Sequence, residues 1–199
     1  MSDRYDPTTA LVVVDVQNDF ADPAGGLYVA GGDAVVPLVN EQVAAARAAG
    51  APVFYTQDWH PATTPHFAKD GGVWPVHCVA DTWGAELHPQ LEVLDDAPIV
   101  RKGVDGGDGY SGFSVRDPVS GATSATQLGS LLERAAVTRV VVTGLAGDVC
   151  VKETALDAVR LGFPTTVPLA TTRMVELEDG DGQRAIETLQ AAGVEVVPA

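Results

Sequence analysis

The chain has 199 residues, of which 46% are hydrophobic and 20% charged, a composition typical of a folded globular protein rather than a disordered one. It carries 12 Lys and Arg residues against 27 Asp and Glu residues, and the resulting net charge of −15 disfavours nucleic acids and anionic membranes as partners. The length fits one domain over residues 1–199.

The amino-terminal stretch MSDRYDPTTA lacks the basic-then-apolar pattern of a secretory signal. No apolar run reaches the length of about 18 residues that a membrane span requires. We therefore expect a soluble, cytoplasmic protein, in which a disulfide between Cys78 and Cys150 is disfavoured because the compartment is reducing. The chain is compatible with self-association into a homo-oligomer.

In the first half of the chain, short apolar runs alternate with a helical segment. Residues 10–16 (ALVVVDV) predict a buried strand. Residues 33–50 have apolar side chains at helical spacing and end on Gly50, which predicts a helix. Two further strands are predicted at 52–58 and 98–103.

The second half continues the alternation. It predicts a helix at 124–136 with a Ser or Thr cap, a strand at 139–144, a helix at 148–162, a strand at 164–170, a helix at 181–193 and a strand at 194–197. Strands that alternate with helices form parallel sheets with right-handed crossovers. The fold class is therefore a three-layer α/β/α domain with a six-stranded parallel sheet, Rossmann-like in organisation.

Two long segments, 59–97 and 104–123, show neither helical nor strand periodicity and are rich in Gly, Pro, His and aromatic residues. Long irregular segments in compact domains are usually functional, so we expect them to wall a pocket. The aromatic side chains that could line a slot for a flat ring are Phe20, Trp74, Tyr110 and Phe113.

Chemically useful groups stand where predicted strands end. These positions are Asp15, Asp58, Lys102 and the turn 144–150. Parallel sheets bind ligands beyond the carboxyl ends of their strands, so the four groups should meet at one edge. Two other acids, Asp19 and Asp148, are interpreted as helix-cap or surface residues.

A histidine-rich stretch suggests a metal site. Three of the four histidines, His60, His66 and His77, follow Asp58 within about twenty residues. Imidazole with carboxylate suits Zn²⁺, Fe²⁺ or Mn²⁺ rather than Ca²⁺. The alternative is a set of polar loop residues on an acidic surface, but the concentration of histidines favours the metal. Cys78 could be a further ligand, although its apolar neighbours favour a buried structural thiol.

Cys150 lies in GLAGDVCVK, where Gly144 and Gly147 permit a tight turn before the next helix. Backbone N–H groups and the helix dipole at that position should lower the thiol pKa and could hold an oxyanion. A small apolar core residue is the alternative. The carboxylate of Asp15 and the ammonium of Lys102 at neighbouring strand ends favour a nucleophile, because thiol-based acyl chemistry requires a base and a cation.

The glycine-rich segment 103–113 (GVDGGDGYSGF) raises the hypothesis of a phosphate-binding loop. It lacks the spacing of the G-x-x-x-x-G-K-[ST] motif and does not open an apolar helix. The sequence therefore gives little support to nucleotide binding.

Several motifs occur in a characteristic order: VVVDVQNDF, DWHP followed by HF, WPVHC, GAELHP, RKG, YSGF and GLAGDVCVKETALDAV. In this respect the chain, from about residue 8 to 170, resembles the nicotinamidases, also called pyrazinamidases, of the isochorismatase-like cysteine hydrolases. The resemblance implies a six-stranded parallel sheet between helix layers, a catalytic triad of Asp15, Lys102 and Cys150, and one divalent transition metal (Zn, Fe or Mn). The implied metal ligands are Asp58, His60 and His77, with His66 as a fourth ligand in some members.

The resemblance also implies a cis peptide between Leu145 and Ala146, with the N–H groups of Ala146 and Cys150 as the oxyanion hole. The substrate-binding residues that it implies are Phe20, Trp74, Tyr110, Leu145 and Ala146. Val149 and Gly147 stand where larger residues are common, which leaves open the preference among pyridine and pyrazine amides.

The expected activity is hydrolysis of nicotinamide, a small-molecule substrate, to nicotinate and ammonia through a cysteine thioester. One alternative is another isochorismatase-like hydrolase acting on N-carbamoyl or ureido compounds, although such relatives generally lack the metal ligands. The other alternative is a non-catalytic metal-binding or small-molecule-binding module.

Overall fold

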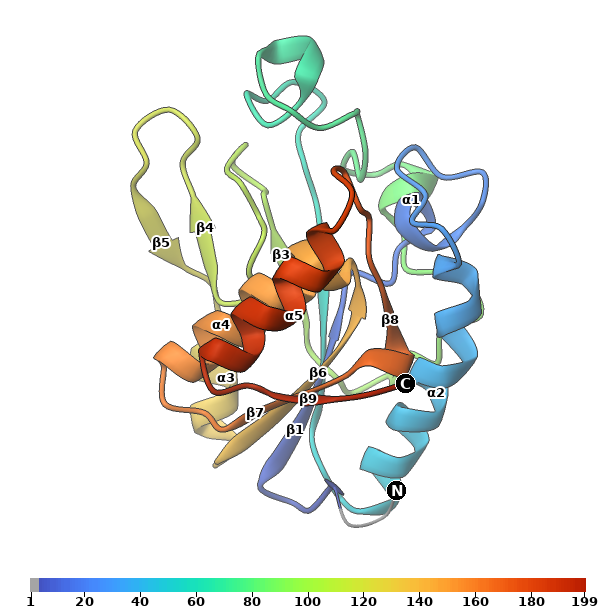
Figure 1. Ribbon diagram of the computed structural model, residues 1–199, viewed down its shortest axis with the longest axis vertical. Helices are drawn as coiled ribbons and strands as arrows, with labels where there is room; N and C mark the ends of the chain where they lie inside the picture. The colour runs from blue at the N-terminus through green and yellow to red at the C-terminus, as the bar shows by residue number, and fades with distance from the viewer. Residues whose placement is uncertain (1–3) are drawn as a thin grey trace.

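The computed structural model describes residues 4–199 and has a parallel sheet at its centre (Figure 1). The main path of the sheet runs through β3 (Ile99–Lys102), β2 (Val53–Asp58), β1 (Thr9–Val14), β6 (Arg139–Leu145), β7 (Thr165–Pro168) and β9 (Glu195–Val197). A short seventh strand, β8 (Thr172–Arg173), pairs with the end of β6. The prediction of six parallel strands is confirmed. The additional strand β8 was not predicted, because two residues are too few to show a strand pattern.

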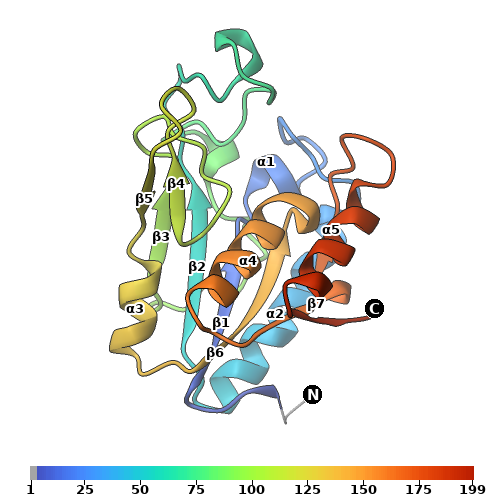
Figure 2. The same cartoon turned by 60° about the vertical axis from the view of Figure 1, so that its left-hand side comes forward.

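Helices cover both faces of the sheet, which makes three layers (Figure 2). They are α1 (Asn18–Ala21), α2 (Gly32–Ala48), α3 (Leu128–Arg134), α4 (Lys152–Arg160) and α5 (Asp181–Ala191). Leu11 and Val13 of β1 pack with α1 and α2 on one face, whereas Val12 and Val14 pack with the other three helices on the opposite face. β1 is buried along its whole length because side chains that alternate across a strand face both layers.

The predicted helix at 124–136 begins later than its sequence suggests. Thr123–Ala125 form β5, which pairs antiparallel with β4 (Ser114–Arg116) in a hairpin, so the segment 104–123 is not wholly irregular. The turn between the two strands is organised by Asp117, whose carboxylate accepts the N–H groups of Val119 and Ser120. The Thr126 hydroxyl then accepts the N–H of Leu128, so α3 begins only there.

Three other segments depart from the predicted regular elements. The predicted helix at 148–162 starts with a single π turn, η4 (Gly147–Val151), before α4. The 3₁₀ turn η5 (Leu169–Thr171) replaces the end of the predicted strand 164–170. Within 59–97 the regular pieces are two short 3₁₀ turns, η2 (Ala68–Asp70) and η3 (Trp83–Ala85). Among residues 4–199, no helix combines the length and the apolar character needed to cross a membrane.

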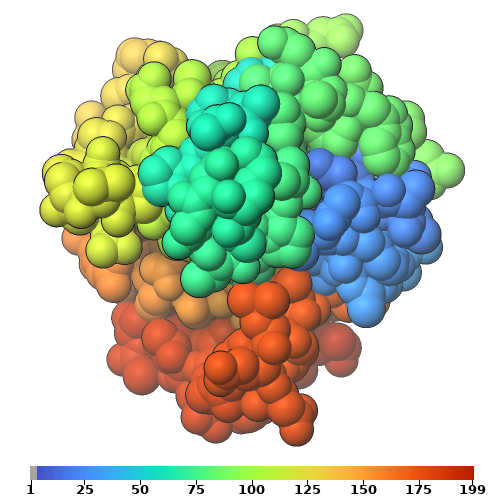
Figure 3. Space-filling model, turned by 90° about the horizontal axis from the view of Figure 1, so that it is seen from above, coloured from blue at the N-terminus to red at the C-terminus, as the bar shows by residue number. Residues whose placement is uncertain are grey.

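The long segment 59–97 follows β2, and its teal part rises beyond the carboxyl end of the sheet (Figure 1). In the view onto that end, its teal part lies in the middle, between green residues further along the chain and the orange stretch that precedes α5 (Figure 3). The strand ends that carry the polar groups are therefore covered by loops.

Candidate active site

Four strand ends bring charged groups and a thiol together. Asp15 directly follows β1, Asp58 ends β2, Lys102 ends β3, and Cys150 lies in η4 just after β6. The Lys102 Nζ is 2.7 Å from Asp15 Oδ2, 2.5 Å from Asp58 Oδ1 and 3.8 Å from Cys150 Sγ. It also donates a hydrogen bond to the carbonyl oxygen of Gly109. The side chains of all four residues are buried, and the Lys102 ammonium contacts each of the other three.

The charges in this cluster follow from burial and proximity. Burial raises the pKa of Asp15 to about 6, although the nearby Lys102 ammonium opposes the rise. Burial also raises the pKa of Asp58, but Lys102 and the neighbouring imidazoles lower this pKa by a larger amount, so it falls below its ordinary value. Burial lowers the pKa of Lys102, yet the two carboxylates raise it well above its ordinary value. Lys102 is therefore a cation, and Asp15 is the carboxylate best placed to exchange a proton near neutrality.

The thiol of Cys150 corrects one expectation. Its pKa was expected to be lowered by the start of a helix, but burial raises it well above the ordinary value, against the opposing effect of Lys102. η4 continues directly into α4, so the thiol does lie in the first turn of a helical segment, but burial outweighs any favourable effect of the helix start. The resting group is a protonated thiol, which needs a base before it can attack a substrate.

Asp15 is positioned to be that base. One of its oxygens lies within 4.8 Å of the Cys150 sulfur. Thr56 Oγ1 donates a hydrogen bond of 2.6 Å to Asp15 Oδ1, while Oδ2 faces the Lys102 ammonium at 2.7 Å. The Asp15 backbone has a φ of 48°, a left-handed conformation that is uncommon outside glycine and concentrated at functional sites.

Next to this cluster, three imidazoles face one another around Asp58. One ring nitrogen from each of His60, His66 and His77 lies within 4.8 Å of the other two. Asp58 Oδ2 is 3.9 Å from His60 Nε2 and 4.0 Å from His77 Nε2. His77 Nδ1 donates to the Pro75 carbonyl oxygen at 2.8 Å, which leaves its Nε2 as a lone-pair donor toward the group.

The same residues pass a test of fit for a divalent transition metal. Both ring nitrogens of His60 are buried and, within the described chain, have no hydrogen-bond partner, which is costly unless another group binds them. Burial lowers the pKa of His77 to about 4 and also lowers the pKa of His66, so both rings are neutral at pH 7 and able to ligate a metal. Three imidazoles and a carboxylate form a donor set that suits such an ion.

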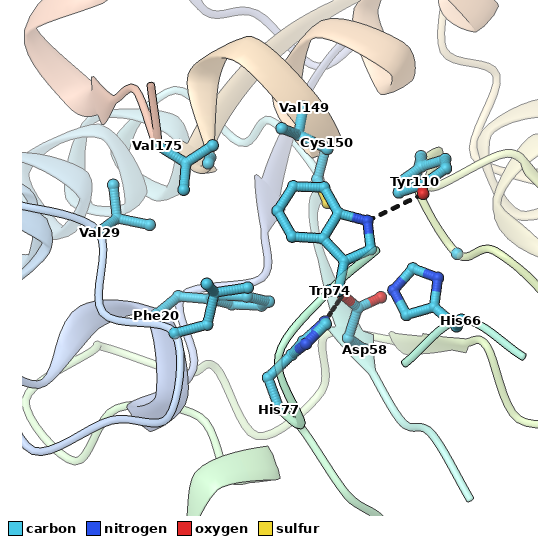
Figure 4. Close-up of a pocket in the computed structure, with 13 residues that line it drawn as sticks. Phe20, Val29, Asp58, His66, Trp74, His77, Tyr110, Val149, Cys150 and Val175 are labelled. Carbon is cyan, nitrogen blue, oxygen red and sulfur yellow. Dashed lines mark hydrogen bonds and ion pairs between the residues drawn. The ribbon is translucent and has the colours of Figure 1, made fainter. Parts of the chain in front are cut away.

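A pocket opens between the imidazoles and the thiol (Figure 4). Its lining includes the aromatic rings of Phe20, Trp74 and Tyr110 and the aliphatic side chains of Leu27, Val29, Val149 and Val175. Trp74 Nε1 donates a hydrogen bond of 2.9 Å to the Tyr110 hydroxyl, so these two rings form one wall. Asp58, His66, His77 and Cys150 reach the same pocket. A flat, largely apolar molecule would therefore lie with one edge near the imidazoles and another near the sulfur.

The prediction that Phe113 lines the pocket is wrong, whereas the cis peptide bond is confirmed. Phe113 does not line the pocket but packs in the core, with its ring centroid 6.3 Å from that of Phe163, because it faces the layer of α3 and α4. The Leu145–Ala146 peptide bond is cis, as the resemblance implied. The Leu145 side chain is buried in the core, whereas Ala146 and Cys150 line the pocket.

Two acids interpreted as cap or surface residues are instead buried and organise loops. Asp19 accepts hydrogen bonds from the N–H groups of Gly26 and Cys78, at 2.8 and 2.6 Å. Asp148 accepts the N–H groups of Val175 and Glu176. Long loops contain N–H groups without partners in a strand or helix, and these carboxylates satisfy them. Both cysteines are free and buried, and Cys78 does not line the pocket.

Three residues that support the site, Gln17, Thr56 and Asp108, were not among those predicted from the sequence. The Gln17 carboxamide accepts the N–H of Asp58 at 2.8 Å and donates to its carbonyl oxygen at 2.7 Å, which fixes the main chain of that acid. Asp108 Oδ1 lies 2.7 Å from His66 Nδ1. For Gln17 and Thr56 the available signal was a polar residue in or just after a strongly apolar strand, a position that is buried and so demands a partner. Asp108 lies in the glycine-rich loop between β3 and β4 and has no such signal.

Comparison with known proteins gives a consistent result. A sequence profile described as the isochorismatase domain matches residues 9–199. A nicotinamidase of Escherichia coli (strain K12) is 36% identical over 203 residues, covering 94% of this chain and 93% of its own. A nicotinamidase/pyrazinamidase of Mycobacterium tuberculosis is 37% identical over 191 residues, covering 94% and 97%.

Solved structures agree with this fold. The pyrazinamidase of Pyrococcus horikoshii in complex with zinc has a TM-score of 0.86 at 36% identity, covering 97% of this chain and 100% of its own. PnC1 from L. infantum in complex with nicotinate has a TM-score of 0.87 at 34% identity, covering 96% and 93%.

Proposed function

The chain belongs to the isochorismatase family, and we propose that it hydrolyses nicotinamide to nicotinate and ammonia in NAD salvage. The observation that carries the proposal is one pocket in which a thiol, a carboxylate and an ammonium stand beside three imidazoles. Curated relatives from bacteria and yeast are nicotinamidases, and one similar solved structure holds nicotinate.

The pocket supports binding of a flat ring with a carboxamide. The ring would lie among Phe20, Trp74 and Tyr110, with its carboxamide carbon over the Cys150 sulfur. Asp58, His60, His66 and His77 would hold one divalent metal ion, Zn, Fe or Mn, which would supply a Lewis acid for the ring nitrogen. Binding would thus fix the attack geometry before any bond changes.

Each residue of the site then has its own role in the reaction. Asp15 accepts the thiol proton, and the Cys150 sulfur adds to the carboxamide carbon while Lys102 balances the negative charge. The N–H groups of Ala146 and Cys150 receive the oxyanion. Asp15 returns its proton to the departing ammonia, and a thioester remains. A water molecule deprotonated by Asp15 hydrolyses the thioester, which releases nicotinate and restores the thiol.

Other relatives define the alternatives. A ureidoacrylate amidohydrolase of Methylobacterium radiotolerans is 36% identical over 75% of this chain. A probable inactive nicotinamidase of Arabidopsis thaliana is 32% identical over 82% of it. The buried imidazole group opposes a ureido substrate, and the contacts of Lys102 with both Asp15 and Cys150 oppose an inactive protein.

The test is ammonia release by the full chain from nicotinamide, pyrazinamide and an N-carbamoyl or ureido compound, each measured as isolated, after chelation and after return of Zn²⁺, Fe²⁺ or Mn²⁺. We expect turnover of nicotinamide that chelation lowers and metal restores. Turnover of the ureido compound alone, or no ammonia from any of the three after metal is restored, would refute the proposal.

A further inference from the structure

The glycine-rich segment 103–109 is explained neither as a phosphate loop nor by the proposed reaction. In the structure it lies against the imidazole group. Gly103 has a φ of 75°, and a Cβ at this position would be 2.5 Å from His60 Cε1. A Cβ at Gly109 would be 3.0 Å from Asp58 Oδ1. Only glycine lets the backbone approach these two side chains so closely.

Side-chain hydrogen bonds hold the same segment to the loop that carries His66. Thr64 Oγ1 donates to the Gly106 carbonyl oxygen at 2.7 Å and accepts the N–H of His66 at 3.2 Å. Two residues beyond Gly106, the Asp108 carboxylate lies 2.7 Å from His66 Nδ1. The segment therefore touches three of the four residues of the proposed ligand set.

Asp108 is itself fixed from the opposite side. Its backbone N–H and carbonyl oxygen both pair with Arg116 of β4, at 2.6 and 3.1 Å. The Arg116 guanidinium is 3.7 Å from Asp108 Oδ2, and the Asp108 side chain is 9% exposed. These contacts hold the Asp108 carboxylate against the His66 ring.

We propose that Asp108 is a positioning residue for the metal, because it accepts the Nδ1 proton of His66 and so leaves Nε2 as the metal-binding atom. Gly103 has a complementary role, since it leaves the space that the His60 ring occupies. Ligating histidines usually donate their second N–H to such a partner, which orients the ring and raises its basicity. The inference rests on the metal site of the proposed function.

The first test measures the dissociation constant of Zn²⁺ by competition with a chromophoric chelator, on the full chain. Asp108→Ala should weaken binding by about 10- to 100-fold. Asp108→Asn should weaken it less, because its amide oxygen can still accept from Nδ1. Asp105→Ala is the matched control, since Asp105 is an exposed acid of the same segment, and the Zn²⁺ affinity of this variant should stay unchanged.

The melting temperature of the metal-free variants separates positioning from general destabilisation. A purely structural role of Asp108 would lower that temperature and leave the affinity of the folded protein intact. An affinity of Asp108→Ala within twofold of that of the unsubstituted chain would overturn the inference. Should Asp108→Ala fail to fold, Asp108→Leu replaces it, because Leu is of similar size but offers no acceptor to His66 Nδ1. Absence of Zn²⁺ binding by the unsubstituted chain would instead refute the metal site, and with it this role.

The second test compares two glycines that have the same left-handed backbone conformation. Gly103 and Gly121 have φ values of 75° and 73°, but a Cβ at Gly121 would meet only the Arg116 side chain, at 3.7 Å. Gly103→Ala and Gly121→Ala therefore carry similar conformational costs, and only the first pushes against His60. We expect Zn²⁺ affinity to fall in Gly103→Ala alone. Equal affinities in the two variants would contradict the proposed role of Gly103.

Discussion

Replacing Thr56 by Val should move the pH dependence of the enzyme upward. Thr56 Oγ1 donates a hydrogen bond of 2.6 Å to Asp15 Oδ1, and this bond stabilises the ionised carboxylate and lowers its pKa. Val keeps the shape but cannot donate. A hydrogen bond to a charged group contributes about 1.5–3 kcal/mol, so its loss should raise the pKa from about 6 to between about 7 and 8.

The sign follows from the role of Asp15 as a base, because only the ionised form can take the thiol proton. In the unsubstituted chain, kcat/KM for ammonia release should fall as the pH drops through about 6, rather than through the ordinary value of 3.8. In Thr56→Val the fall should begin at higher pH, so that activity at pH 6 is roughly 5- to 50-fold lower but recovers at alkaline pH.

The assay is a pH profile of kcat/KM with nicotinamide, with metal-loaded protein at each pH. Thr143→Val is a matched control, since Thr143 is also buried in the sheet but its hydroxyl donates to the Thr171 carbonyl oxygen, at 3.0 Å, rather than to Asp15. Its acidic limb should coincide with that of the unsubstituted chain. An acidic limb near pH 4 in that chain, or an unmoved limb in Thr56→Val, would refute the assignment of Asp15 as the base.

Three further substitutions test the rest of the site. Cys150→Ala should lower kcat at least about a thousandfold while Zn²⁺ still binds, and normal turnover would exclude a thioester. Lys102→Met should leave two buried carboxylates without their cation and lower the free energy of unfolding by about 3–5 kcal/mol, measured by denaturant titration; an unchanged value would show that the ammonium is not their principal partner. Asp19→Ala should lower the free energy of unfolding by about 1–3 kcal/mol, because the buried N–H groups of Gly26 and Cys78 would lose their acceptor. An unchanged melting temperature would contradict that role.

The alternation of strands and helices was predictable because a parallel sheet buries both faces of its central strands. The apolar run at 10–16 and the amphipathic pattern at 33–50 are direct signs of that burial, and β1 and α2 occupy these ranges to within two residues. The hairpin of β4 and β5 was not predictable in this way. Its strands have three residues each, those of β5 are all exposed, and their order depends on side-chain bonds in the turn.

The candidate site also has features that were predictable from the sequence and features that were not. That Asp15, Asp58, Lys102 and Cys150 share one edge follows from parallel topology, which sequence periodicity reveals. The protonated state of the thiol did not follow, because it depends on how completely the loops exclude water. The roles of Thr56 and Asp108 were also out of reach, because parallel topology brings strand ends together but does not tell which side chain within a strand or loop will bond to Asp15 or to His66.

Lys102 bridges Asp15 and Asp58, and this arrangement links two functions that are usually adjusted independently. Any change at Asp58, by substitution or by exchange of the ion it would bind, alters how much positive potential remains for the sulfur. Double variants at Asp15 and Asp58 should therefore depart from additivity. An engineer who selects for a new metal preference in this chain will also be selecting, through one shared ammonium, for a different nucleophile.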